Sequence, residues 1–290
     1  MDFSTNLLDK DEISIEIWIA SHIFSLQRLE WTKEMLLSLK LQTDKNFTVY
    51  WSFSCEKFID EHLKKLISST KLDLGCPIFL FPHIERKTQF EHIQHILDST
   101  QSSTNSERKL NNFILFCDDD DMYHKTRVEK IRNIISKYPD TLYFKDHSQI
   151  IQGIDTIHKW NDKEVLDIYE VERYDFINGK MKMDVVSDFG NIICKKSLIE
   201  KFFENDVLDK DYIEKNKQIA GLIDCAFSSW LQQYSTEYSK INEILYLKRI
   251  EIFTNTRTRC WDKQKDFNFD EVKDGEGWGL QTIYFQMSEK

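Results

Sequence analysis

The chain has few of the residues that break or loosen a fold, with 3 prolines and 8 glycines among 290 residues. Long flexible linkers are therefore not expected, because such segments are rich in these residues. The sequence has no GxGxxG segment, which argues against a dinucleotide-binding enzyme. It also has no run of the ~18 apolar residues that a membrane-spanning helix needs, so we expect no transmembrane segment.

The 6 cysteines are scattered, and none forms a CxxC pair. Several lie within apolar runs, which favours buried free thiols in a reducing compartment over a disulfide framework. The first twelve residues are polar and acidic and lack the apolar core of a signal peptide. Together these features predict a cytoplasmic protein.

The composition indicates a globular chain with a negative surface. Apolar residues make up 41% and charged residues 30%, and the formal net charge is −10. A general nucleic-acid binder needs a basic face, so we expect no nucleic-acid partner. A nucleotide held through a metal ion remains compatible with this charge.

Residues 113–121 form the most informative stretch. Five apolar residues, from Phe113 to Cys117, run directly into four aspartates, Asp118 to Asp121. Such an apolar run predicts a strand buried on both faces of a parallel sheet, whose carboxyl end is where α/β folds bind ligands. Four adjacent like charges repel one another, and a divalent cation with oxygen ligands would neutralise them. The alternative is a solvated acidic turn that caps the next helix.

A helix is predicted directly after the aspartates. The segment from Thr126 to Glu129 has the spacing of a capping box, and apolar residues then recur at helical spacing from Val128 to Ile135. Pro139 ends the helix. The aspartates therefore lie on a short loop between a buried strand and an amphipathic helix.

The rest of the first half alternates between strand and helix patterns. Strands are predicted at 13–20, 47–53 and 78–81, the last ended by Pro82, with helical apolar stripes between them. This βαβαβαβ order is typical of a parallel α/β sheet with right-handed crossovers. The second half predicts short strands at 142–144, 149–151 and 156–160, a buried strand ending at Cys194, helices from Ser197 and around 222–231, and a last strand at 243–251.

Three segments together resemble a GT-A glycosyltransferase of the family 2 type. The first strand with the helix of residues 30–43, which ends in Ser-Leu-Lys-Leu-Gln-Thr, is similar to that family's opening unit. Residues 116–129 resemble its DXD strand, loop and helix. Residues 189–198, followed by Gly221 to Cys225, resemble its acceptor-side strand and helix start.

This resemblance implies an α/β fold of the GT-A type, with a Rossmann-like, mostly parallel sheet flanked by helices and a small antiparallel region. It implies one domain over residues 1–253, in which 13–121 bind the nucleotide sugar and 122–253 face the acceptor. Residues 254–290 would form a C-terminal tail or loop. The implied activity is transfer of a sugar from a UDP- or GDP-linked donor to a hydroxyl of a glycan or another acceptor.

The resemblance also assigns roles to residues on the donor side. Asp120 and Asp118 would hold a Mn or Mg ion, and Asp118 or Asp119 would contact the ribose or a metal-bound water. Hard oxygen ligands suit these two metals. Ser21 and Arg86 would lie beside the nucleotide, although Arg86 could equally be a surface charge next to Glu85.

On the acceptor side, the resemblance places the base of an inverting transfer at Asp224. Asp188 is the second candidate base and lies, with Gly190, in the acceptor-side loop. For Asp224 the alternative is a carboxylate that only stabilises a helix N-terminus.

Two further groups of residues have the composition of a binding site. The basic residues Arg249, Arg257 and Arg259, with Trp261, could close over the donor diphosphate or form a basic surface strip. His83, His92 and His95 have a metal-like composition, but ordinary helix positions are favoured because no partner carboxylate pattern accompanies them.

The competing functions are a non-catalytic carbohydrate- or metal-binding module and a nucleotidyl or phosphoryl transferase that uses the same acidic loop. A haloacid-dehalogenase phosphatase would have Thr or Val at the position of Met122.

Overall fold

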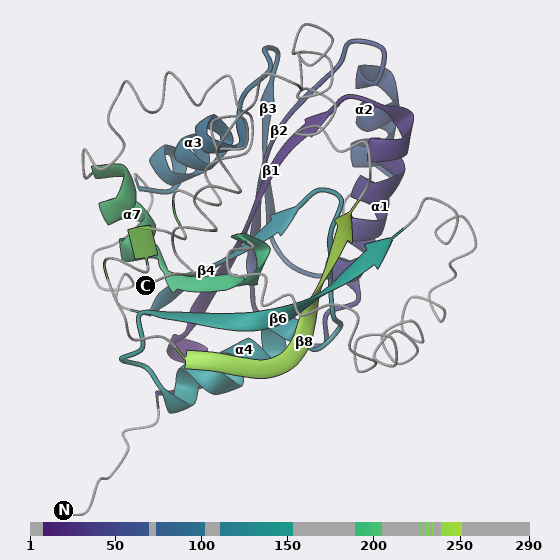
Figure 1. Cartoon of the computed structure of the whole chain (residues 1–290). Coiled ribbons are helices and arrows are strands. Elements are labelled where there is room, and N and C mark those ends of the chain that lie inside the picture. The colour runs from purple at the N-terminus through teal and green to yellow at the C-terminus, as the bar shows by residue number, and fades with distance from the viewer. Residues whose placement is uncertain are drawn as a thin grey trace, which may run out of the picture.

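The structure is a computed structural model, and the residues described are 8–69, 74–101, 111–152, 189–204, 227, 230–231, 234 and 239–250. The described elements in chain order are η1 (Lys10–Glu12), β1 (Ser14–Ile23), α1 (Leu26–Lys40), β2 (Thr48–Cys55), α2 (Asp60–Ser69), β3 (Ile78–His83), α3 (Gln89–Gln101), β4 (Asn112–Asp118), β5 (Met122–Tyr123), α4 (Arg127–Lys137), β6 (Tyr143–Gln152), η4 (Phe189–Asn191), β7 (Ile192–Lys195), α7 (Lys196–Glu204) and β8 (Ser239–Ile250). The strands form one eight-stranded sheet in the order β3-β2-β1-β4-β7-β6-β8-β5 (Figure 1).

The half of the sheet made of β3, β2, β1 and β4 is parallel throughout. Successive strands are joined by α1, α2 and α3, which confirms the βαβαβαβ order expected from the sequence. β1 and β4 lie side by side, and Ala20 near the end of β1 pairs with Asp118 at the end of β4. The four strands therefore end at the same edge of the sheet.

The sheet carries an apolar core on each face, because the central strands are apolar at almost every position. In β4, Phe113 and Leu115 pack with residues of α1, α2 and α4. The alternate residues Ile114 and Phe116 pack with residues of α3 and α7 on the opposite face. Successive side chains of a strand point to opposite faces, so this pattern confirms a strand buried on both sides.

The second half of the sheet is mixed. β7 pairs antiparallel with β4 and with β6, β8 runs parallel to β6, and the short β5 pairs antiparallel with β8. The two strand-like pieces expected at 142–144 and 149–151 belong to one strand, β6. The expected strand at 156–160 and the tail from 254 lie outside the described residues, so the division of the chain at residue 253 stays a prediction.

Two local expectations were wrong. The predicted capping box does not form, because Thr126 makes no side-chain cap to α4. Its hydroxyl instead lies 2.9 Å from His124 Nδ1, and Glu129 Oε2 accepts a 2.7 Å hydrogen bond from Thr43. Pro82 does not end β3 either, since pairing with β2 continues through Pro82 to His83. β3 is an edge strand, and an edge strand needs hydrogen bonds on one side only.

Four cysteines lie in the described part of the chain, and all four are free thiols; Cys117 and Cys194 are buried. No helix in the described ranges has the length and apolarity to cross a membrane.

Candidate active site

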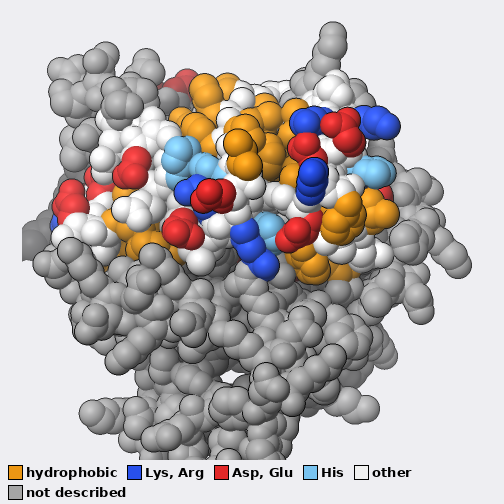
Figure 2. Space-filling model, turned by 90° about the horizontal axis from the view of Figure 1, so that it is seen from above, with side chains coloured by type: hydrophobic (Ala, Val, Ile, Leu, Met, Phe, Trp, Pro, Cys, Tyr) orange, Lys and Arg blue, Asp and Glu red, His pale blue; other side chains and the backbone are white. Residues whose placement is uncertain are grey.

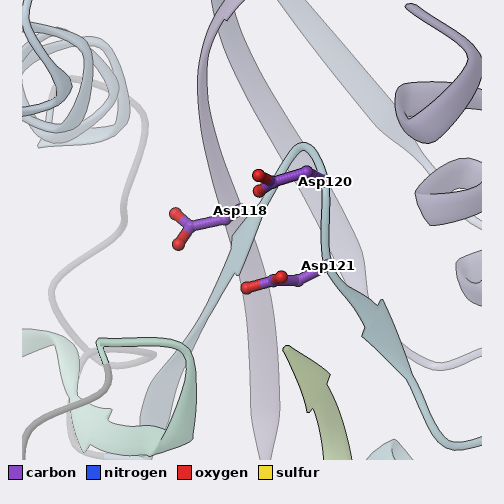
Figure 3. Close-up of side chains that lie close together, drawn as sticks. All are labelled: Asp118, Asp120 and Asp121. Carbon is purple, nitrogen blue, oxygen red and sulfur yellow. The ribbon is translucent and has the colours of Figure 1, made fainter. Parts of the chain in front are cut away.

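The aspartates lie in a tight turn at the carboxyl end of β4. Asp118 is the last residue of the strand, and the backbone N–H of Asp121 donates a 3.2 Å hydrogen bond to the Asp118 carbonyl. This four-residue turn reverses the chain. As a result, Asp118, Asp120 and Asp121 point to the same side of the turn (Figure 3), and each offers a carboxylate oxygen within 4.8 Å of the others.

These carboxylates are largely withdrawn from water. Asp119 and Asp121 are each 1% exposed and Asp120 is 8% exposed. The alternative of a solvated acidic turn is therefore wrong. Buried carboxylates are costly unless donors or positive charge surround them, and the structure provides both.

Donors from three separate elements reach the four aspartates. Arg28 of α1 pairs with both Asp119 Oδ1 and Asp120 Oδ2. Gln89 Nε2, at the start of α3, donates a 2.9 Å hydrogen bond to Asp118 Oδ1. The Tyr246 hydroxyl of β8 donates a 2.6 Å hydrogen bond to Asp121 Oδ2. These partners were not found from the sequence; the one available signal for Arg28 was a basic residue just beyond the end of the neighbouring strand.

Burial and neighbouring charges shift the pKa values of Asp119 and Arg28 in opposite directions. Burial raises the pKa of Asp119 to about 6, although Arg28 opposes the shift. For Arg28, burial alone would lower the pKa, but the attraction of Asp119 and Asp120 outweighs burial and raises it. Both side chains still have an unmet polar atom, since Asp119 Oδ2 and Arg28 Nε are buried without a hydrogen-bond partner.

The residues present fit a hard divalent cation. Three carboxylates supply converging oxygen ligands, and four negative charges face the single positive charge of Arg28 among these contacts. Mg and Mn prefer such oxygen sets. The resemblance assigns Asp118 and Asp120 to the metal, and the structure brings Asp121 into the same group.

A buried arginine connects the aspartate turn to the second half of the sheet. Arg127 Nε donates a 2.8 Å hydrogen bond to Asp146 Oδ2, and its guanidinium carbon lies 4.1 Å from the centre of the Tyr123 ring and 4.7 Å from that of Tyr246. The same guanidinium donates to the carbonyl of Gly190. The tyrosine that holds Asp121 is therefore itself held in place by a buried cation.

The other expected site residues are placed as follows. Ser21 is 2% exposed in β1, and its hydroxyl accepts a 2.7 Å hydrogen bond from Trp51 Nε1. Arg86 is exposed on the loop between β3 and α3. Gly190 is buried in η4 against the Tyr246 ring. The roles of these three residues stay predictions.

Several candidates lie outside the described residues, namely Asp188, Asp224, Arg257, Arg259 and Trp261. Arg249 lies in β8, but its side chain is outside what the structure describes.

Histidines and serines form a hydrogen-bonded group at the ends of β1, β2 and β3. Ser52 Oγ lies 2.9 Å from His83 Nε2 and 2.8 Å from His92 Nδ1. Ser54 Oγ lies 3.3 Å from His92 Nε2 and 2.9 Å from His22 Nδ1. Burial lowers the pKa of His83 to about 4 and that of His92 to about 3. Among the described residues, the group whose ligand atoms converge as in a metal site is Asp118, Asp120 and Asp121. His83 and His92 share the Ser52 hydroxyl as a hydrogen-bond partner.

Figure 2 shows the end of the molecule toward which β1, β2 and β3 run. Acidic and basic side chains lie next to one another on this face, with histidines and apolar patches between them. The described part of this face is thus chemically mixed, with both signs of charge interspersed.

No protein-family model matches the chain, and no curated protein sequence matches it either. Solved structures do. S. aureus TarS 1-349 in complex with UDP-GlcNAc matches with a TM-score of 0.51 and 12% identity, over 84% of this chain and 60% of that chain. S. aureus TarS 1-349 alone matches with a TM-score of 0.54 and 12% identity, over 94% of this chain and 78% of that chain.

Identity this low shows the fold alone. The structure therefore has the GT-A-like α/β fold that the sequence resemblance implied, with a parallel half and a small antiparallel region. In the UDP-GlcNAc complex, the matched region is less than two thirds of the other chain.

The close packing of Gly190 against Tyr246 predicts that Gly190→Ala disturbs the aspartate turn. A Cβ at this position would overlap the Tyr246 ring, so the ring must shift and its hydrogen bond to Asp121 is lost. Overpacking of this kind costs about 1–3 kcal/mol in the free energy of unfolding. Tyr246→Phe, which removes only the hydroxyl, is the matched comparison and should cost about 1.5–3 kcal/mol, the usual range for a hydrogen bond to a charged group. Urea unfolding measures both, and a Gly190→Ala protein as stable as wild type would contradict the packing.

The neutral state of His92 predicts an acid-dependent loss of stability. An unfolded histidine has a pKa of about 6.5, while that of folded His92 is about 3, so the folded state disfavours protonation. The stability that comes from keeping His92 neutral is fully present above pH ~6.5. It is lost as the pH falls toward 3, by about 2.5 kcal/mol between pH 7 and 4.5.

His92→Gln should therefore flatten the dependence of the unfolding free energy on pH in this range. His62→Gln, which changes an exposed histidine on α2, is the control and should keep the wild-type slope. Urea titrations at several pH values measure the slopes. Equal slopes for wild type and His92→Gln would show that His92 is not held neutral.

Proposed function

We propose that this chain is a metal-dependent glycosyltransferase that moves a sugar from a nucleoside-diphosphate donor to an acceptor hydroxyl. The observation that carries the proposal is the convergence of three carboxylates at the carboxyl end of β4, with Asp119 Oδ2 beside them buried and without a hydrogen-bond partner. The similarity to S. aureus TarS, which has been solved in complex with UDP-GlcNAc and with UDP, supports a nucleotide-sugar donor.

In this proposal Asp118, Asp120 and Asp121 hold Mn or Mg through their converging oxygens. When bound, the cation stabilises the negative charge that grows on the leaving diphosphate. Asp119 contacts the ribose or a metal-bound water and is kept in place by Arg28. The hydrogen bonds from Gln89 and Tyr246 fix the outer carboxylates, so little rearrangement is needed for them to act together.

The remaining roles follow the sequence resemblance. Residues 13–121 form the donor side, where Ser21 and Arg86 lie beside a UDP- or GDP-linked nucleotide. Residues 122–253 form the acceptor side with Asp188 and Gly190. Asp224 removes the proton from the acceptor hydroxyl in an inverting transfer, which needs a base on that side.

The metal role of Asp120 predicts the effect of Asp120→Asn. Wild type should gain thermal stability with Mn and one of UDP, GDP or CMP, since a ligand present at 100 times its Kd stabilises by about 2.7 kcal/mol. Asp120→Asn should lose this Mn-dependent gain and the slow hydrolysis of the matching nucleotide sugar. Asp98→Asn, on the exposed face of α3, should keep both.

Each outcome separates the competing functions. A gain in thermal stability with Mn, but no further gain with any of the nucleotides, fits a metal-binding module. Hydrolysis of the nucleotide sugar that survives in Asp120→Asn argues against the metal site.

The proposed base predicts a division between binding and turnover. Asp224→Asn should keep the Mn-dependent thermal gain with nucleotide, because the donor site is intact. It should lower the single-turnover rate of donor cleavage by about 100-fold or more, the usual contribution of a general base. If the rate is unchanged, the role of the base passes to Asp188, and Asp188→Asn is the variant that tests it.

A further inference from the structure

Arg28 is held at the centre of the aspartate turn by the start of α1. Ser25 caps the helix by accepting a 3.0 Å hydrogen bond from the backbone N–H of Arg28, and this fixes the residue in the first turn. The Arg28 side chain is only 12% exposed and ends between Asp119 and Asp120. It is thus a built part of the site rather than a surface charge.

The Arg28 pair and a cation would compete for the same carboxylate. Asp120 contacts Arg28, and it also belongs to the three residues whose oxygens converge. A divalent cation held there would lie close to the guanidinium, and two positive charges at such short range repel strongly in a partly buried site.

Three buried polar atoms at and beside the Arg28 pair have no hydrogen-bond partner. Arg28 Nε and Asp119 Oδ2 lack hydrogen-bond partners, and so does Nε2 of the neighbouring Gln27, although all three atoms are buried. Buried polar atoms without partners are uncommon and call for an explanation. Two of these atoms are donors, and Arg28 lies in the N-terminal turn of a 15-residue helix, so the place favours an anion.

We propose that Arg28 is a diphosphate-binding residue that changes partner. It pairs with Asp119 and Asp120 before a cation binds, and it turns to the diphosphate oxygens when a cation takes over the carboxylates. This inference rests on the proposed function. Under this inference, a residue in the first turn of α1 binds the diphosphate directly, while the carboxylates bind it through the metal. A guanidinium suits both partners, because it binds carboxylate and phosphate groups with two parallel hydrogen bonds.

A purely structural role for Arg28 predicts the opposite result. If Arg28 only holds the turn together, its removal disorders the carboxylates and weakens cation binding. If Arg28 competes with the cation, its removal strengthens cation binding and weakens diphosphate binding.

The experiment measures Mn²⁺ binding alone and then pyrophosphate binding at saturating Mn²⁺, both by isothermal titration calorimetry at pH 8. Pyrophosphate is the probe because it has no base or sugar. The variants are Arg28→Met, which keeps the apolar stem, and Arg28→Gln, which keeps hydrogen-bond donors without the charge. Lys33→Met removes one charge from an exposed pair with Glu30 on the same helix and is the control.

We expect both Arg28 variants to bind Mn²⁺ about tenfold more tightly than wild type. We expect them to bind pyrophosphate about tenfold more weakly once Mn²⁺ is saturating. Lys33→Met should match wild type in both titrations. Circular dichroism confirms the fold, and if Arg28→Met does not fold, Arg28→Gln carries the test.

The inference is overturned if Mn²⁺ binding in the folded Arg28 variants is unchanged or weaker, or if pyrophosphate binding is unchanged. A failure of the proposed function looks different. In that case neither wild type nor Lys33→Met would show Mn²⁺ binding that is lost in Asp120→Asn.

Discussion

The buried guanidinium of Arg127 is the interaction on which the shape of the site depends. It pairs with Asp146 of β6, lies against the rings of both Tyr123 and Tyr246, and donates to the backbone of η4. Removing one partner of a fully buried ion pair usually destabilises a protein by about 3–5 kcal/mol, because the other charge is left uncompensated. Here such a loss would reach the aspartate turn directly, since one of the two flanking tyrosines also holds Asp121.

The aspartate turn shows how a protein can concentrate negative charge before any ligand binds. The donors come from α1, α3 and β8, three elements that are far apart in the sequence and meet only when the sheet has formed. The stabilisation of the buried carboxylates is therefore a property of the whole fold rather than of the loop. The same arrangement aims the carboxylates in one direction, which a loop of four repelling charges could not maintain alone.

Patterns that depend on neighbours in the sequence were predicted well. The apolar run before Asp118 identified a central strand, and the alternation of strand and helix patterns identified the parallel half of the sheet. Contacts between distant segments could not be predicted, and these include Arg28 with the aspartates and Tyr246 with Asp121. The capping box failed partly for the same reason, because the distant Thr43 donates a hydrogen bond to Glu129. The Thr126 hydroxyl is taken by a local partner, His124.

The position of Pro82 bears on how the molecule avoids self-association. β3 is one outer strand of the sheet, and the aromatic ring of Phe79 on it is half exposed. An open strand of this kind invites a strand of another molecule to add to it, which begins aggregation. A proline cannot donate a backbone hydrogen bond, so Pro82 interrupts the ladder that an incoming strand would need. At the other outer strand, β5 has two residues, too few to template an intermolecular sheet.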